Sequence, residues 1–138
     1  MLELLVVLAI VAMATAGVTM AMRDTAQTAL EREAQRLAVL FESARAQSRA
    51  SGAAVYWHTT ADGFRFEGLL PGALPDRWLA EGTMVRGSSR VQLGPEPIIG
   101  PQAVDLVRVS QSSGQPDRVL RVTTDGLRPF VVQAPGQP

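Results

Sequence analysis

The chain has 138 residues, 46% of them hydrophobic, which suits one modest domain with an appendage and is not the composition of a disordered protein. Its 13 basic and 13 acidic residues balance, so no global charge attracts nucleic acid or an anionic surface, and such binding would need a local patch. The chain has no Cys, which excludes disulfides, thiolate zinc sites and Cys nucleophiles.

The first 22 residues are almost entirely apolar. Residues 4–22 carry no charge and, as a helix, would extend roughly 28 Å, close to the thickness of a hydrocarbon core of about 30 Å. The alternative is a cleavable secretory signal, for which Ala14-Thr15-Ala16 would be the cleavage site. Because no basic residue precedes the apolar run and the helical pattern continues beyond it, we predict a retained transmembrane helix over residues 1–22.

An amphipathic continuation of the same helix is predicted over residues 23–51. Apolar side chains recur there every three or four residues, at Leu30, Ala34, Leu37, Phe41 and Ala44. The other faces carry Glu31, Arg32, Gln35, Arg36, Glu42 and Arg45. We expect Gly52 to end one continuous helix of roughly 73 Å, and we assign Leu30, Leu37 and Phe41 to the face that packs on the following domain.

Residues 52–133 are predicted to form a β domain of about seven to eight strands. Short alternating and β-branched runs are separated by turn residues, with hairpin signals at Ala61-Asp62-Gly63 and Asp125-Gly126. The stretch "GPEPIIGPQ" is too rich in Pro for a central strand and should be an extended loop or edge segment. Residues 134–138 are expected to be a flexible tail. The fold class is therefore α+β, with a long N-terminal helix packed on an antiparallel β-sheet or β-sandwich.

The N-terminal run "LELLVVLAIVAMATAG", followed by an amphipathic helix and a β domain, resembles the N-terminus of type IV pilins and of type II secretion pseudopilins. Within that superfamily, "ARAQSRASGAAVYW", "LGPEPIIGPQ" and "RVTTDGLRPFVV" resemble the minor pseudopilin H group of type II secretion, the GspH/FimT family. The resemblance implies a pilin-like fold. It also implies a minor subunit of the periplasmic pseudopilus, which drives folded proteins across the outer membrane.

The expected partners, by the same resemblance, are the major and other minor pseudopilins, contacted through the N-terminal helix. The expected location is the bacterial inner membrane, with a single pass and the C-terminal domain in the periplasm. Family precursors carry a basic leader that a prepilin peptidase removes before an aromatic residue, which is then N-methylated. Met1 stands at the family's third mature position, so we expect an upstream start codon or a trimmed chain.

Glu3 is the one charge in the apolar segment, and the next charged residue is Arg23. A carboxylate without a partner in hydrocarbon costs on the order of several kcal/mol. The resemblance implies that Glu3 faces the N-terminal amine of a neighbouring subunit and acts in subunit assembly. The alternative is that Glu3 sits at the membrane interface, near a helix N-terminus that mildly favours negative charge.

The sequence predicts no catalytic, cofactor or metal site. His58 is the single histidine, no Gly-x-Ser-x-Gly motif is present, and the carboxylates of the β domain are scattered. The densest basic pairs, Arg86 with Arg90 and Arg118 with Arg121, are interpreted as a solvated face rather than a nucleic-acid patch. Two alternatives remain: a minor type IV pilin that acts in pilus assembly or DNA uptake, and a membrane-tethered or secreted periplasmic enzyme that uses His58.

Overall fold

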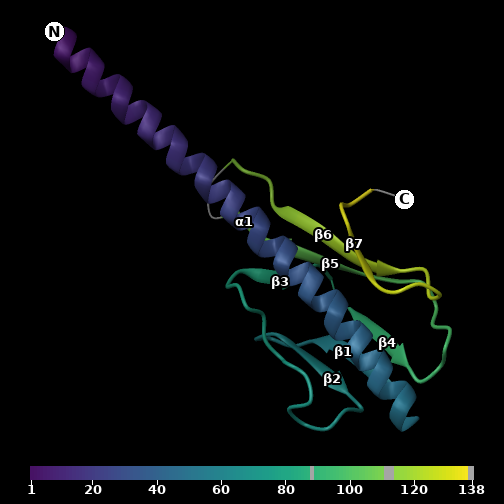
Figure 1. The fold of residues 1–138 in the computed structure, drawn as a ribbon. Helices are drawn as coiled ribbons and strands as arrows, with labels where there is room; N and C mark the ends of the chain where they lie inside the picture. The colour runs from purple at the N-terminus through teal and green to yellow at the C-terminus, as the bar shows by residue number, and fades with distance from the viewer. Residues whose placement is uncertain (88, 111–113, 137–138) are drawn as a thin grey trace.

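A computed structural model describes residues 1–87, 89–110 and 114–136 of the chain (Figure 1). One helix is followed by seven strands: α1 Leu2–Ser51, β1 Val55–Thr59, β2 Phe64–Glu67, β3 Thr83–Val85, β4 Arg90–Gly94, β5 Gln102–Arg108, β6 Arg118–Thr124 and β7 Val131–Gln133. The α+β class with a long N-terminal helix on antiparallel strands is confirmed. Residues 137 and 138, the end of the predicted tail, lie outside the described residues.

Helix α1 continues without a break from the apolar run into the amphipathic segment and ends where the glycine signal predicted. Gly52 has φ 73° and ψ 4°, and its N–H donates to the carbonyl of Ser48 at 2.8 Å. A residue with a Cβ is disfavoured in this left-handed conformation, which glycine adopts readily. The Ser48 hydroxyl donates to the carbonyl of Ala53 at 2.6 Å and so holds the first residues of the loop against the last turn.

The strands form two antiparallel sheets, a three-stranded sheet in the order β2-β1-β4 and a four-stranded sheet in the order β3-β5-β6-β7. Both predicted hairpin turns lie where expected, between β1 and β2 and between β6 and β7. The second turn is stabilised by Asp125, whose carboxylate accepts hydrogen bonds from the N–H groups of Leu127 and Arg128. These two bonds are the principal cause that lowers the pKa of Asp125.

Consecutive strands β3 and β4 belong to different sheets. The pairing of β3 with β5 extends to Arg86, whose N–H donates to the carbonyl of Asp105 at 2.9 Å. Gly87 then takes φ 77°, and the chain leaves β5 to pair as β4 with β1. The Gln102 side chain joins the sheets again, because its amide donates to and accepts from the backbone of Gln92 at 2.9 and 2.7 Å. Strand β3 is therefore not paired with the three-stranded sheet, whereas the Gln102 side chain bonds the two sheets to each other beside β4.

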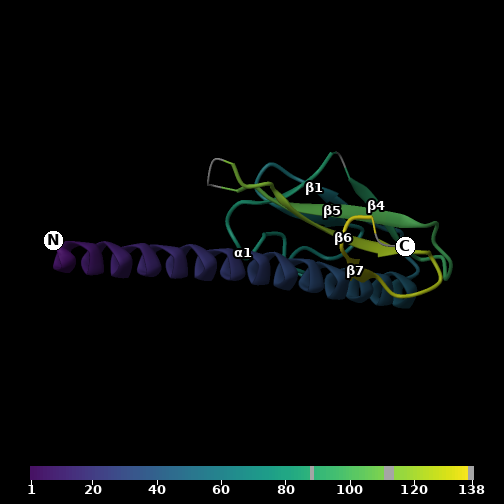
Figure 2. The ribbon, with the colours of Figure 1, turned by 90° about the horizontal axis from the view of Figure 1, so that it is seen from above.

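The hydrophobic core lies between α1 and the two sheets, and Figure 2 shows the C-terminal half of the helix along one face of the strands. Phe41 is fully buried at the centre of this layer. Its ring centroid lies 5.2 Å from that of Trp57 on β1 and 4.8 Å from that of Phe130, which precedes β7. The helix is thus packed on strands of both sheets, and the β domain is held to it as one body with a shared core.

Candidate functional site: the exposed half of the helix

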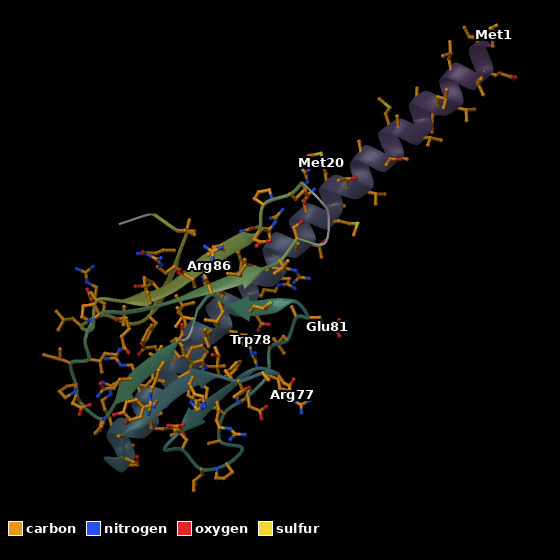
Figure 3. All side chains as sticks on the ribbon, turned by 180° about the vertical axis from the view of Figure 1, so that it is seen from behind. Met1, Met20, Arg77, Trp78, Glu81 and Arg86 are labelled. Carbon is orange, nitrogen blue, oxygen red and sulfur yellow. The ribbon has the colours of Figure 1, made fainter. Side chains whose placement is uncertain are left out.

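The first half of α1 extends beyond the β domain without packing on it. Every residue from 1 to 23 is exposed, and the side chains between Met1 and Met20 project from the helix on all sides (Figure 3). By length and composition this helix is apolar enough to cross a membrane. Such a surface is far larger than the apolar patches that soluble monomers expose to water, which is compatible with a membrane span or a signal anchor.

The hydroxyl groups of the apolar segment are satisfied within the helix itself. Thr15 donates to the carbonyl of Val11 at 2.8 Å, and Thr19 donates to that of Thr15 at 2.9 Å. These bonds let both side chains enter hydrocarbon without an unpaired donor, since the helix already satisfies its own backbone. The hydroxyls therefore require no partner from outside the chain.

Glu3 differs from these residues. It lies in the first turn of α1, where the helix dipole favours a negative charge, and among the described residues its carboxylate forms no hydrogen bond or ion pair. The next charged side chain, Arg23, is about 30 Å away along the helix axis, at a rise of about 1.5 Å per residue. No cationic side chain among the described residues therefore lies near Glu3, and the α-amino group of Met1, two residues away, forms no ion pair with it.

The residues assigned to the packing face lie in the core. Leu30, Leu37 and Phe41 have exposed fractions of 0%, 1% and 0%. Val39, on the opposite face of the same turns, is 64% exposed. The second half of α1 thus has one face that the β domain does not cover, and this exposed face adjoins the exposed first half of the helix.

A buried carboxylate that the sequence did not single out fixes the β domain to the helix. Glu33 is 2% exposed, and its carboxylate accepts hydrogen bonds from the N–H groups of Leu79 and Ala80 at 2.7 and 2.9 Å. Arg36, one turn later, forms an ion pair with Glu33 at 3.2 Å and donates to the carbonyl of Arg77 at 3.0 Å. These bonds hold the loop before β3 against α1.

A similar contact lies two turns further on. The carboxylate of Glu42 accepts a hydrogen bond from the N–H of Phe130 at 3.0 Å and pairs with Arg45 at 3.2 Å. Arg45, which the helical pattern placed on a polar face, is only 5% exposed. Spacing along the helix could not reveal these contacts, because the acceptors and donors come from loops distant in sequence.

Three of the four arginines in the basic pairs of the β domain are bonded to neighbouring side chains. Arg90 pairs with Glu67 at 3.3 Å and lies over the ring of Tyr56, with the guanidinium carbon 4.5 Å from the ring centroid. Arg121 donates two hydrogen bonds to Asp105, at 2.7 and 3.1 Å. These bonds are the main cause that lowers the pKa of Asp105, and the nearby charge of Arg86 adds to the effect. Arg118 donates to Gln27 of the helix at 2.9 Å.

The Asp105–Arg121 pair gives a testable pH dependence. Since the pKa of Asp105 is lowered on folding, the pair stabilises the β domain above the unfolded pKa of about 3.9, and this stabilisation is lost as the pH falls through the folded value. When the pH is lowered from neutral to about 3, we expect the free energy of unfolding of D105N to fall less than that of the wild type. Urea unfolding followed by Trp fluorescence measures the difference. The prediction would be contradicted if D105N and R121Q lost as much stability as the wild type over this pH range.

His58 lies on β1 with its Nδ1 atom 3.4 Å from a carboxylate oxygen of Glu67. Among the described residues no three His, Asp or Glu side chains gather as a metal ion would require. The distinctive feature of the molecule is therefore the exposed apolar helix with its single carboxylate. Comparisons with protein-family models, with curated proteins and with solved structures found no match to this chain.

Proposed function

We propose that this protein is a membrane-anchored structural subunit of a pilin-like filament, and specifically a minor pseudopilin of type II secretion. The observation that carries the proposal is Glu3, a carboxylate with no hydrogen bond or ion pair among the described residues, at the start of an apolar helix that the described part of the β domain does not cover. A helix that only anchored a domain would gain from this charge only the mild preference of a helix N-terminus for negative charge. A helix that stacks beside identical or related helices can neutralise it with a neighbour's N-terminal amine.

The arrangement of the β domain suits the same role. It packs on one face of the second half of α1 and leaves the opposite face, around Val39, open along the whole helix. Helices can then pack together in the filament while the β domains lie on its outside. In this proposal residues 1–22 lie in the inner membrane before assembly and the β domain lies in the periplasm.

The alternative of a DNA-binding minor pilin shares the fold but needs cations free to contact phosphate groups. Arg90, Arg118 and Arg121 are each bonded to another side chain of the chain itself. The fourth arginine of the basic pairs, Arg86, is exposed and forms no side-chain hydrogen bond or ion pair among the described residues, so the engagement of the other three is what favours the secretion role over DNA uptake. Loss of secretion without loss of DNA uptake in a strain that lacks the gene would separate the two.

The test of the proposal is the replacement of Glu3 in the natural precursor, in the bacterium that produces it. We expect E3L to remain in the inner membrane but to lower the export of folded proteins by at least about tenfold, since a single unpaired membrane carboxylate is worth several kcal/mol. Filament incorporation is measured by disulfide cross-linking of V7C to cysteine-bearing pseudopilins. The wild-type chain, which has no Cys, is the control for cross-linking.

E31Q is the matched control for the loss of a carboxylate, because Glu31 lies on the exposed face of α1 and bonds only to Gln27 among the described residues. It should assemble and support export like the wild type. Normal export and normal cross-linking by E3L would show that Glu3 has no role in assembly. A chain found outside the membrane fraction would overturn the proposal as a whole.

A further inference from the structure

The separation of the two sheets leaves a slot in the surface of the β domain. Its volume is about 410 Å³, which lies within the usual range of binding pockets. One wall is the end of β1 with its turn, residues 59–63, and the other is the loop and strand at residues 78–85. No residue of β5 lines the slot, so it runs along the edge of β3 that faces away from β5.

This edge of β3 carries backbone groups that are not bonded. Arg86 forms a hydrogen-bonded pair with Asp105, and such pairs alternate along an antiparallel ladder. By this alternation Met84 directs its N–H and C=O to β5, while those of Thr83, which is 7% exposed, and of Val85 are directed to the other edge, which borders the slot. Among the described residues no hydrogen bond reaches these groups, which leaves β3 as an open edge of the kind that accepts another strand.

The opposite wall is only partly open. Among the described residues β4 pairs with β1 only as far as His58. Thr60 donates its N–H to the carbonyl of Gly63 across the β1–β2 turn at 3.0 Å, so its backbone groups face β2. The slot is thus bordered by the free edge of β3 and by the end of β1 at Thr59. An extended segment of polypeptide is the ligand whose own backbone groups match such borders.

The side chains that line the slot define the chemistry of the occupant. Asp62 and Glu81 stand on opposite walls, both exposed, and the described lining includes no Arg. Arg86 lies at the far end of β3, where Figure 3 shows it away from Glu81, and its charge acts on Asp105. The apolar contribution comes from Trp78 and from Met84, which is 56% exposed. The slot is therefore acidic with apolar patches.

One wall is held in place before any ligand arrives. Leu79 and Ala80, both in the lining, are bonded through their N–H groups to the buried carboxylate of Glu33. Trp78 packs edge-to-face on Phe64, with ring centroids 4.7 Å apart. A preformed wall lowers the entropy cost of binding, because little of the slot has to be ordered with the ligand.

We propose that this slot binds an extended, cationic segment of another protein, which pairs as a strand with β3. Backbone hydrogen bonds to Val85 and Thr83 would supply the register, and Asp62 and Glu81 would select basic side chains. Met84 and Trp78 would contact the apolar residues between them. This site is independent of the filament contacts of α1, so either proposal can fail without the other.

The probe is a fluorescent synthetic peptide of about six residues, the length of an ordinary strand, with alternating Val and Arg. The full chain in detergent micelles is expected to bind it in the micromolar range, and to bind a peptide of alternating Val and Glu at least about tenfold more weakly. Amide hydrogen exchange at Val85 should slow by at least about tenfold with the basic peptide, because its N–H becomes paired. Binding without slower exchange at Val85 would overturn the strand-pairing proposal.

Two variants separate the slot from general charge effects. D62N/E81Q changes two exposed side chains and should weaken the binding of the basic peptide by at least about tenfold. E31Q/E96Q removes two exposed carboxylates elsewhere and should bind like the wild type. Equal binding by both double variants would overturn the proposal, as would no binding at all. A Val85 amide already protected by pairing of two copies would assign the slot to self-association instead.

Discussion

Replacing Phe41 by Ala is expected to lower the free energy of unfolding of the β domain by about 3–5 kcal/mol, the usual cost of removing a buried aromatic ring. Phe41 is fully buried and makes edge-to-face contacts with Trp57, Phe66 and Phe130. The ring thus connects the helix with both sheets. Urea unfolding in detergent micelles, followed through the fluorescence of Trp57 and Trp78, measures the change.

V39A is the matched control for F41A, because Val39 lies two residues away on the same helix but is 64% exposed. It should change the free energy of unfolding by less than about 0.5 kcal/mol. An equal loss in both variants would show that the helix contributes through its intrinsic stability and not through the core. F41L, which keeps most of the apolar volume, should fall between the wild type and F41A.

Replacing Glu33 by Leu is expected to cost about 2–4 kcal/mol, although Leu is the more hydrophobic residue. The change removes the charged acceptor of the Leu79 and Ala80 N–H groups, and the loss of a hydrogen bond to a charged group costs about 1.5–3 kcal/mol. It also removes the partner of Arg36. E33Q keeps one acceptor oxygen and should lose only about 1–2 kcal/mol.

Hydrogen exchange at Leu79 and Ala80 distinguishes this explanation from a general loss of stability. In E33L these two amides should exchange faster than the rest of the β domain, because the loop before β3 is no longer held to the helix. The exposed change E31Q should leave both the exchange and the unfolding midpoint as they are in the wild type. Slow exchange at both amides in E33L would show that the loop is held by other contacts.

The sequence by itself determined the helix, the hairpins and the class of fold. An apolar run followed without a break by an amphipathic pattern, with Gly52 after it, predicted one helix, and the structure has this helix at Leu2–Ser51. The turns at Ala61-Asp62-Gly63 and Asp125-Gly126 were readable because turn chemistry depends on adjacent residues. Glu3 was also visible from sequence alone, since a single charge in an apolar run needs no tertiary context to be noticed.

The tertiary structure decided which distant residues meet. The switch of the chain between sheets at Gly87, the bonds of Glu33 to the loop before β3 and the burial of Arg45 follow no local pattern. Each depends on a loop or strand far along the chain, and periodicity reports only the neighbours within one element. The slot beside β3 exists for the same reason, because the free strand edge that borders it appears only when the two sheets separate.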